Sequence, residues 1–347
     1  MAPRGWVFGP AVDLLSIRRT VASPKPHCRV FIERGFRLLL NSASATRLLL
    51  IAVAFTFGLL FPCGCARRSV SNDQNVEANY HDVVDDTDQT VRLPIRPKRI
   101  VSLAPSLTEI VFVVGAGSRL VGDTSYCDYP EEAKRVTHVG DTLNPNIELI
   151  IGLKPDLVLI STASQLEAFS RQLDQQKIPV YISDPHDLNG VLTSIVKIGE
   201  LVDEGAKAKE VANSLNERAR NVESRVDGSR PVRVFYQVSA EPLYTAGRDS
   251  FVTDLIKRAG GESVTATVPG AWPRYSNESA LAANPDAIII PTGDSMAGGS
   301  AVTVSDALNN SAAVRNRRVY FINGDLLSRP GPRLVEGLEE MAKDLHP

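Results

Sequence analysis

The segment 204-EGAKAKEVANSLNERARNVESRVD-227 decides how the rest of the chain is interpreted. Its apolar residues recur every three or four positions, as on one face of an α-helix: Ala208, Val211, Ala212, Leu215, Ala219, Val222 and Val226. Neither proline nor glycine interrupts the segment after Gly205. At ~1.5 Å per residue the helix would be roughly 33 Å long, about the width of a small domain.

A similar pattern occurs on each side of this helix. The first copy is 148-ELIIGLKPDLVLI-160 and the second is 278-ESALAANPDAIII-290. In both, a glutamate begins a short helical run, a Pro-Asp turn follows, and an apolar strand ends the unit. The spacing from Glu to Pro is identical. We interpret the chain as two similar α/β lobes joined by one long helix; the alternative is a chance similarity between two ordinary helix–turn–strand units.

Composition limits the possible classes. A chain of 347 residues is long enough for two domains of ordinary size and additional segments. Its 43% hydrophobic and 22% charged residues are typical of a globular protein that buries a core. A net charge of −2 offers no electrostatic reason to expect nucleic acid as a partner.

Residues 1–65 are predicted to be a signal sequence with an N-terminal extension. Residues 48–61, LLLIAVAFTFGLLF, form an uncharged apolar run directly after Arg47. This run is short for a bilayer-spanning helix, and its basic lead and small following residues are typical of a secretory signal. The long lead implies either an extended signal or a translation start after Met1. A short membrane anchor is the alternative.

The apolar run is followed by a candidate lipidation site. Gly64-Cys65 resembles the cleavage box of bacterial lipoproteins, in which the cysteine is acylated, although Pro62 stands where leucine is usual. Cys65 is therefore the predicted lipidation site, and Cys63 is the poorer candidate. Cleavage there would leave Cys127 as the only other cysteine, so no disulfide framework is expected. The protein is expected to be exported to the periplasm or cell envelope.

Residues 66–97 are predicted to be a tether and a small hairpin. Residues 67–81 are polar and lack apolar periodicity, whereas 83–93 place apolar and β-branched residues on both sides of a turn. The acidic residues of this turn are predicted to be solvated: Asp82, Asp85, Asp86 and Asp88. A calcium loop is disfavoured because the required glycine and distal glutamate are absent.

The lobes are predicted at 98–203 and 229–347, with the joining helix at 204–228. Strands and helices alternate in both, which favours an α/β fold with two doubly wound parallel sheets. Ser106 is the predicted N-cap of the first helix, with Glu109 completing a capping box. The expected strands are 100–103, 120–122, 157–160, 178–182, 232–238, 243–246, 287–290 and 319–322, and the other main helices are 187–202, 250–259 and one near 331–345.

Several motifs carry a family resemblance. They are 98-KRIVSLAPSLTEI-110, 121-VGDTSYCDYP-130, Asn146-Ile-Glu148 and Lys154-Pro-Asp156. In order and content they resemble the periplasmic substrate-binding proteins of cobalamin and siderophore ABC importers, and most closely the cobalamin-binding branch. The resemblance covers roughly residues 80–345. It implies two lobes bridged by one helix, a corrinoid ligand such as cobalamin in the cleft between them, and an ABC permease in the membrane as partner.

The resemblance carries over five ligand-binding residues. Tyr126 matches an aromatic ligand contact in the Ser-Tyr-x-Asp-Tyr-Pro loop, and Trp272 matches a tryptophan that flanks the corrin ring. Tyr244, Asp325 and Arg329 match an aromatic residue and a polar pair of the same cleft. Flat aromatic faces suit a large planar ring. The alternative is that each aromatic residue only packs within its own lobe.

Two departures leave the ligand open. The cobalamin-binding branch has further tryptophans in its cleft, and here their places hold Thr142 and Ser161. The predicted pocket therefore has less aromatic area. A receptor for an iron-siderophore or haem is the alternative of the same class.

Glu148 and Glu278 are the predicted permease-docking residues. They occupy equivalent positions in the two repeats, and the resemblance implies that such glutamates meet basic residues of the permease. A local role at a helix N-terminus is the alternative.

Enzyme and metal functions are not expected. The chain lacks a nucleophile elbow, a Walker loop and a zinc-binding histidine pair, and Gly115-Ala-Gly117 is a helix stop rather than a dinucleotide fingerprint. The four histidines after residue 80 are scattered, at positions 81, 138, 186 and 346. We therefore predict a monomeric binding protein without catalytic residues, cofactor or metal. An exported α/β enzyme is the alternative from another class.

Overall fold

The computed structural model describes residues 79–162, 167–293 and 303–347, all within one compact unit, residues 71–347. The predicted signal and the lipidation site at Cys65 lie outside the described residues. Within the described ranges, no helix has both the length and the apolar content that crossing a membrane requires.

The predicted long helix is confirmed as α7, Gly205–Val226. Its apolar stripe is buried as expected, at Ala208, Ala212, Leu215, Ala219 and Val222. Before it lie β1 Tyr80–Val84, β2 Thr90–Pro94, β3 Ile100–Ser102, α3 Pro105–Val113, β4 Leu120–Gly122, α4 Ile147–Gly152, β5 Leu157–Ser161, α5 Glu167–Gln175, β6 Val180–Ser183 and α6 Leu188–Leu201, with 3₁₀ turns η1 Gly117–Arg119 and η2 Glu131–Arg135. After it lie β7 Val232–Ala240, β8 Leu243–Thr245, α8 Phe251–Arg258, β9 Gly261–Ser263, α9 Asn277–Ala283, β10 Ala287–Thr292, η4 Asp306–Leu308, α11 Ala312–Arg315, β11 Val319–Asn323, α12 Gly324–Ser328 and α13 Leu334–Leu345.

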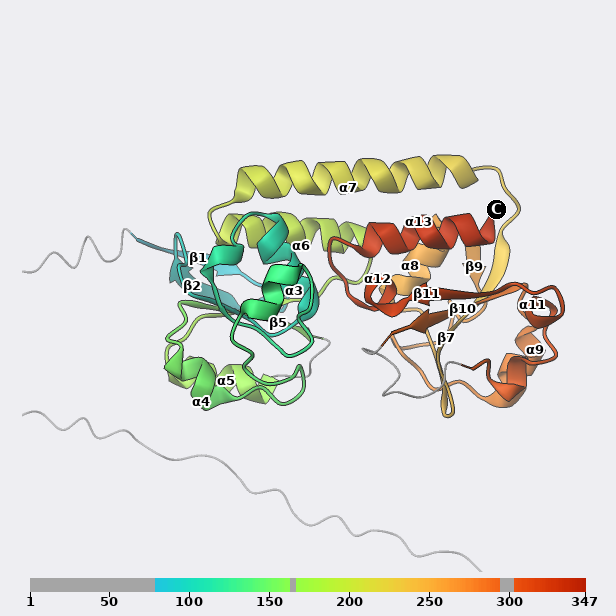
Figure 1. The fold of residues 1–347 in the computed structure, drawn as a ribbon, viewed down its shortest axis with the longest axis horizontal. Coiled ribbons are helices and arrows are strands. Elements are labelled where there is room, and N and C mark those ends of the chain that lie inside the picture. Colours follow the sequence, from blue (N-terminus) through green and yellow to red (C-terminus); the bar gives the residue numbers. More distant parts are fainter. Residues whose placement is uncertain (1–78, 163–166, 294–302) are drawn as a thin grey trace, which may run out of the picture. The chain divides into compact units, whose positions relative to one another are not determined.

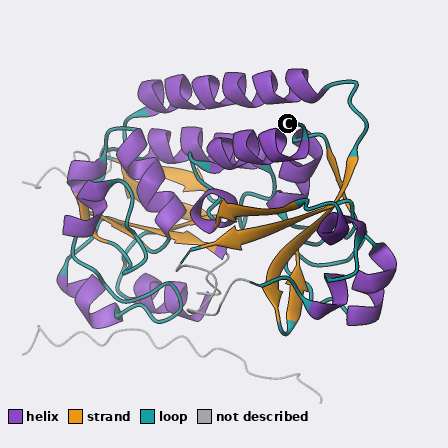
Figure 2. Cartoon of the chain, turned by 45° about the vertical axis from the view of Figure 1, so that its right-hand side comes forward, coloured by secondary structure: helices purple, strands orange, loops and turns teal. Residues whose placement is uncertain are grey.

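Each lobe is built on its own sheet, with helices on both faces (Figures 1 and 2). The N-terminal lobe has the strand order β4-β3-β5-β6, with every pair parallel. The C-terminal lobe has the order β11-β10-β7-β8, and β9 also pairs with β7. This arrangement confirms the predicted α/β fold with two lobes and one joining helix. The predicted limits of the lobes stay a prediction.

The C-terminal sheet corrects one expectation, because it is not wholly parallel. Strand β8 runs antiparallel to β7. Only Glu241 and Pro242 separate the two strands, and a link of two residues can turn a chain back but cannot form the crossover that a parallel neighbour needs. Strand β9, Gly261–Ser263, was not predicted at all, since the Gly260-Gly261 pair at its start resembles a helix stop and the strand is short.

The folded chain contains three clusters of buried apolar residues. The largest runs through both lobes, from α3 and α6 across α7 to α8 and α13, and includes Leu107, Ile195, Leu215, Leu255 and Leu338. The outer face of the N-terminal sheet has its own cluster beneath α4 and α5, and that of the C-terminal sheet beneath α9 and α11. The continuous cluster means that α7 joins the lobes by packing as well as by chain connection.

Helices α6 and α7 lie so close that one position excludes a side chain. A Cβ atom added to Gly199 of α6 would stand 2.1 Å from the Cβ of Ala208 in α7. Such an overlap cannot be accommodated by ordinary packing, so glycine on one helix and alanine on the other set their separation.

The two Glu–Pro–Asp units are equivalent in detail. Helix α4 begins after Asn146, whose side chain accepts from the backbone N–H of Leu149, and α9 begins after Ser276, whose hydroxyl accepts from that of Ser279. Just before each Pro-Asp turn the backbone takes a left-handed conformation, with φ of 49° at Lys154 and 37° at Asn284. These shared caps and turns support the prediction of two similar lobes.

An arginine closes each of these units. Arg99 donates from Nε and Nη2 to the carbonyl oxygen of Leu153, at 2.8 and 2.6 Å. Arg233 likewise donates to the carbonyl oxygens of Asn284 and Ala283, at 3.1 and 2.7 Å. Each arginine stands at the start of its lobe's first sheet strand and satisfies carbonyls that the end of a helix leaves unpaired.

The N-terminus of α3 corrects the predicted cap. The helix begins at Pro105, its N-cap is Ala104, and no side chain caps it. A proline at the first helical position supplies no N–H, so one of the unpaired donors at the helix start is already absent. The expected capping partner, Glu109, is buried and bonds to Arg333 instead. Ser106 is therefore not the cap.

The hairpin β1–β2 is confirmed, but its acidic turn is only partly solvated. Asp85 is buried, and its Oδ1 accepts from the N–H and hydroxyl of Thr87 and from the N–H of Gln89. Asp86 pairs with Lys197 of α6 at 2.6 Å. Asp85 closes the turn, and Asp86 attaches it to the lobe. The prediction that these two acidic residues are solvated is therefore wrong.

Candidate functional site

The predicted ligand residues lie on segments that follow sheet strands. In open sheets with parallel strands, ligand sites form outside the carboxyl ends of the strands. Residues 123–130 follow β4, residues 264–276 follow β9, and helix α12 follows β11 directly. These segments carry Tyr126, Trp272 and the Asp325–Arg329 pair, respectively.

The loop 123–130 is anchored from below and exposes its aromatic residues. Cys127 is buried, and its sulfur lies 3.2 Å from the hydroxyls of Thr108 and Thr124. Burial raises the pKa of the Cys127 thiol, while the hydrogen bonds with the threonines oppose that rise. Tyr126 and Tyr129, on either side of the anchored segment, are 45% and 47% exposed. The loop therefore presents two aromatic rings on a fixed base.

A buried carboxylate supports the start of this loop. Asp123 is fully buried, and its Oδ1 lies 2.8 Å from Nδ1 of His138. Its backbone is paired on both sides, accepting from Val139 and donating to Thr137. The other oxygen, Oδ2, has no hydrogen-bond partner among the described residues. Burial raises the pKa of Asp123 to about 6, although the hydrogen bond with His138 works in the opposite direction.

In the C-terminal lobe, Trp272 is supported by two aromatic neighbours. Its ring meets Phe251 edge-on, with centroids 5.8 Å apart, and lies 6.4 Å from the ring of Tyr236. The side chain is still 37% exposed. Tyr244, on β8, is half-buried and bridges to Arg274 through the backbone. Trp272 is therefore a supported ring with a free surface, which suits either a ligand contact or a packing role.

Asp325 and Arg329 are brought together, and Arg329 also reaches the other lobe. Arg329 Nη2 lies 2.9 Å from Asp325 Oδ1, and Nη1 lies 2.6 Å from Oδ1 of Asp128, in the loop that carries Tyr126. The arginine is only 7% exposed. Burial alone would raise the pKa of Asp128, but the hydrogen bond and the positive charge of Arg329 hold it below its usual range.

Two residues of this region were not found by sequence reasoning. Glu109 of α3 is 3% exposed, and Arg333 before α13 bonds to it through two nitrogens. Arg333 also lies over the ring of Tyr129, 4.1 Å from its centroid. Glu109 was interpreted as a capping residue, and no pattern in the sequence connects it with a position more than two hundred residues away.

The predicted docking residues are exposed. Glu148 and Glu278 are each the second residue of their helix, one position after Ile147 and Asn277. No ion pair of either glutamate is recorded in the described part of the chain. Each helix leads into a strand of a parallel pair and so begins at the sheet edge where the strands end. Both carboxylates therefore lie toward the edge that carries the predicted ligand loops.

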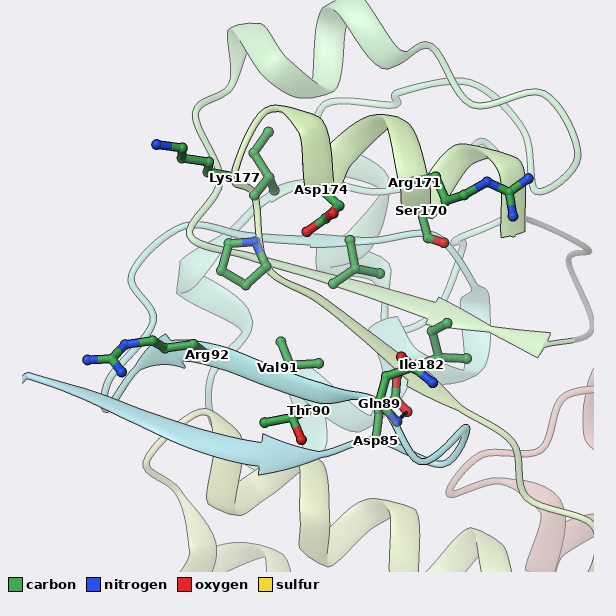
Figure 3. A pocket seen from close by; sticks show the side chains of 13 residues that line it. Asp85, Gln89, Thr90, Val91, Arg92, Ser170, Arg171, Asp174, Lys177 and Ile182 are labelled. Atoms are coloured by element: carbon green, nitrogen blue, oxygen red, sulfur yellow. Dashed lines mark hydrogen bonds between the residues drawn. The ribbon is translucent and has the colours of Figure 1, made fainter. Parts of the chain in front are cut away.

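A cavity of about 550 Å³ lies elsewhere, between β2, β6 and α5 (Figure 3). None of the predicted ligand residues lines it. Its walls carry charged side chains of both signs, Asp85, Asp174, Arg92, Arg171 and Lys177. Walls of this kind do not suit a large ring with apolar faces.

Comparison with known proteins decides the family. The sequence pattern of the periplasmic binding protein family matches residues 100–326. This chain belongs to that family. An ABC transporter substrate-binding lipoprotein of Bacillus subtilis, YvrC, is 32% identical in an alignment of 308 residues that covers 86% of this chain and 96% of the relative.

Two solved structures extend the comparison. The periplasmic vitamin B12 binding protein BtuF of Vibrio cholerae is 27% identical, with a TM-score of 0.64 over 73% of this chain and 98% of that one. A possible iron-binding (periplasmic solute-binding) protein from Staphylococcus epidermidis is 29% identical, with a TM-score of 0.62 over 73% of this chain and 100% of that one.

Membership of the periplasmic binding protein family settles the broad class. The protein is a substrate-binding transport protein and not an enzyme, so its ligand is a cargo and not a cofactor. The predicted α/β fold and the predicted family are both confirmed. The five ligand residues and the two docking glutamates stay predictions.

The buried Asp123 predicts a measurable pH dependence. Its folded-state pKa of about 6 lies above the ordinary 3.8, so the folded protein binds this proton more tightly than the unfolded chain. Wild-type stability should therefore fall as pH rises from about 4 through 6. An asparagine side chain does not titrate, so Asp123→Asn should gain about 2–3 kcal/mol of unfolding free energy relative to wild type between pH 4 and pH 7.

Urea unfolding at several pH values from 4 to 7.5 would measure this difference. Asp174→Asn, which removes one carboxylate at an exposed position elsewhere, is the control for the change in charge. Parallel curves for wild type and Asp123→Asn would show that the buried carboxylate does not titrate in this range.

Proposed function

We propose that this ABC transporter substrate-binding protein captures a corrinoid such as cobalamin between its lobes and delivers it to a membrane permease. The observation that carries the proposal is the presence of exposed aromatic rings on strand-end segments of both lobes, Tyr126 on an anchored loop and Trp272 packed against Phe251. The 27% identity to a vitamin B12 binding protein supports the same ligand class.

Aromatic side chains suit a corrin ring because they offer flat apolar surface at a small cost in conformational entropy. Tyr126 and Trp272 would contact the faces or rim of the ring, and Tyr244 would extend the aromatic surface of the C-terminal lobe. Asp325, together with Arg329, would orient the polar amide groups at the ring periphery, since a few placed polar groups usually fix a ligand's orientation.

An iron chelate or haem is the second candidate ligand. Thr142 and Ser161 replace two tryptophans of the cobalamin-binding branch, and the relative from Staphylococcus epidermidis is described as a possible iron-binding protein. The part of the chain that the structure describes contains no cluster of three or more histidine, cysteine or carboxylate side chains arranged for a metal ion. A chelate held through its organic part fits these residues better than a bare metal.

The ligand assignment predicts a loss of affinity when Trp272 is removed. Trp272→Ala should weaken cyanocobalamin binding by about 1–3 kcal/mol, which is about 5- to 150-fold, because one buried aromatic contact is lost. Titration calorimetry with cyanocobalamin, dicyanocobinamide, haemin and ferrichrome would measure it. Tyr80→Ala, at a similarly exposed aromatic residue of β1, is the control and should bind as wild type.

Two results would contradict this assignment. Unchanged corrinoid affinity in Trp272→Ala would mean that the pocket lies elsewhere. Much tighter binding of haemin or ferrichrome than of either corrinoid would exclude a corrinoid as the cargo while leaving the transport class intact.

We also propose that Glu148 and Glu278 dock the protein on its permease. One carboxylate comes from each repeat, which suits a permease with two equivalent subunits. Charges at the rim of an interface set orientation and association rate more than bulk affinity. The alternative is a local role, because a carboxylate near a helix N-terminus is favoured by the helix dipole.

The docking proposal predicts that transport and ligand binding separate. The Glu148→Arg, Glu278→Arg double variant should abolish corrinoid uptake by cells while ligand affinity in solution stays within about twofold of wild type. A Glu132→Arg, Glu217→Arg double variant changes the net charge equally at exposed positions elsewhere and should support uptake. Wild-type uptake by the first variant would rule out docking through these residues, and loss of folding would favour the local role.

Lipid anchoring at Cys65 is proposed from the sequence, since this residue lies outside the described ranges. The lipoprotein from Bacillus subtilis supports it. Metabolic labelling with a palmitate analogue should mark the wild type and Cys63→Ala but not Cys65→Ala. Label that remains on Cys65→Ala and disappears from Cys63→Ala would move the site to Cys63.

A further inference from the structure

Besides the contact between α6 and α8, the two lobes meet directly at a short segment of the C-terminal lobe. Residues 329–333, between α12 and α13, lie against the first turn of α3. A Cβ atom added to Gly331 would stand 3.2 Å from the Cα and Cβ of Ser106 and 3.3 Å from its carbonyl oxygen. A side chain at this position would crowd Ser106, so glycine suits this close approach of the C-terminal lobe to the N-terminal lobe.

An arginine follows this contact and binds the N-terminal lobe in two ways. Arg333 donates from Nε to Glu109 Oε2 at 3.0 Å and from Nη2 to Oε1 at 2.6 Å. Its guanidinium carbon also lies 4.1 Å from the centroid of the Tyr129 ring. Arg333 therefore joins helix α3 to the loop 123–130 from the opposite lobe. A bidentate pair with a buried carboxylate fixes both position and orientation.

Arg329 strengthens the same contact. It holds Asp128 at 2.6 Å, and its Nη1 lies 3.6 Å from Glu109 Oε1. Two successive residues of the loop, Asp128 and Tyr129, are thus each held by an arginine of the C-terminal lobe. Burial raises the pKa of Glu109, whereas the charges and hydrogen bonds of Arg333 and Arg329 favour its ionised form.

We infer that Arg333 is a positioning residue: from the opposite lobe it fixes the loop 123–130, which carries Tyr126. The loop is anchored to its own lobe at Asp123 and Cys127, and to the other lobe at Asp128 and Tyr129. The presentation of Tyr126 therefore depends on how the lobes meet. The consequence for ligand binding rests on the function proposed above, but the effect on the loop does not.

The structure offers a matched control on the neighbouring helices. Arg218 of α7 donates from Nε and Nη2 to the two carboxylate oxygens of Glu339 in α13, at 3.0 and 2.8 Å. This pair has the same bidentate form as Arg333–Glu109, and it touches neither α3 nor the loop 123–130. The Arg218–Glu339 pair is more exposed than Arg333–Glu109, so Arg218→Lys controls for the loss of a bidentate arginine–carboxylate pair away from the loop, and not for an equal loss of stability.

Hydrogen exchange of the ligand-free protein tests the positioning role. Arg333→Lys keeps the charge near Glu109 but loses the fork and the flat surface over Tyr129, and Tyr129→Leu removes the ring from a half-exposed site that need not disturb the core. Both should speed exchange of the hydrogen-bonded amides of Ser125 and Cys127 by about tenfold. A factor of this size is expected because each variant loses one charge-assisted or ring contact. Arg218→Lys should leave these amides unchanged.

Two exchange results would overturn the inference. One is unchanged protection of the loop in both Arg333→Lys and Tyr129→Leu. The other is an equal increase in Arg218→Lys. The double variant Arg333→Lys, Tyr129→Leu should exchange no faster than Arg333→Lys alone, because the two side chains act through one contact.

Calorimetry with cyanocobalamin then connects the loop with the ligand. Affinity should fall about tenfold in Arg333→Lys and in Tyr129→Leu and stay at the wild-type value in Arg218→Lys. Faster loop exchange with unchanged affinity would overturn the link to the ligand. If the wild type binds neither cyanocobalamin nor haemin, the proposed function fails, while the exchange experiment still decides whether Arg333 holds the loop.

Discussion

The burial of one helical stripe determines how the two lobes are related. Helix α7 places its small and apolar residues into a core that continues from α6 of one lobe to α8 and α13 of the other. The contact with α6 is tight enough that Gly199 faces Ala208 without room for another carbon. Because interiors are close-packed, such a contact has one preferred separation and resists sliding. The packing of α7 thereby sets the relative orientation of the loops that follow the sheet strands in the two lobes.

The electrostatic contacts between the lobes have a different character. Two arginines, Arg329 and Arg333, pair with the carboxylates of Glu109, Asp128 and Asp325. Most of these side chains are largely buried, and Asp128 is about half exposed. Charges withdrawn from water are costly unless every group finds a partner, so such a group specifies geometry more than it adds stability. The apolar core keeps the lobes together, and the ion pairs of Arg329 and Arg333 connect the loop 123–130 and helix α3 with the C-terminal lobe.

The main elements of the fold follow from local patterns that the sequence shows plainly. Helix α7 was predictable because its apolar spacing is regular over all 22 residues, and the repeated Glu–Pro–Asp units because turn residues and apolar runs recur together. The strand β8 was predicted but its antiparallel direction was not, and the short β9 and the uncapped start of α3 were missed, since short links and neighbouring packing decide these features. Glu109 illustrates the limit at the site: its partner lies in the other lobe, and spacing along the chain carries no information about that pair.

Arg99 and Arg233 have a consequence for how the protein can change. Each lobe closes the end of its own helix with its own arginine, at the sheet edge opposite the predicted ligand loops. These carbonyl groups at the ends of α4 and α9 are therefore satisfied without help from the predicted ligand loops. Substitutions in residues 123–130 or 264–275 leave these arginine contacts and the Ser276 cap of α9 in place. The protein is in this sense modular, because the ends of these helices are closed by contacts that do not involve the predicted ligand loops.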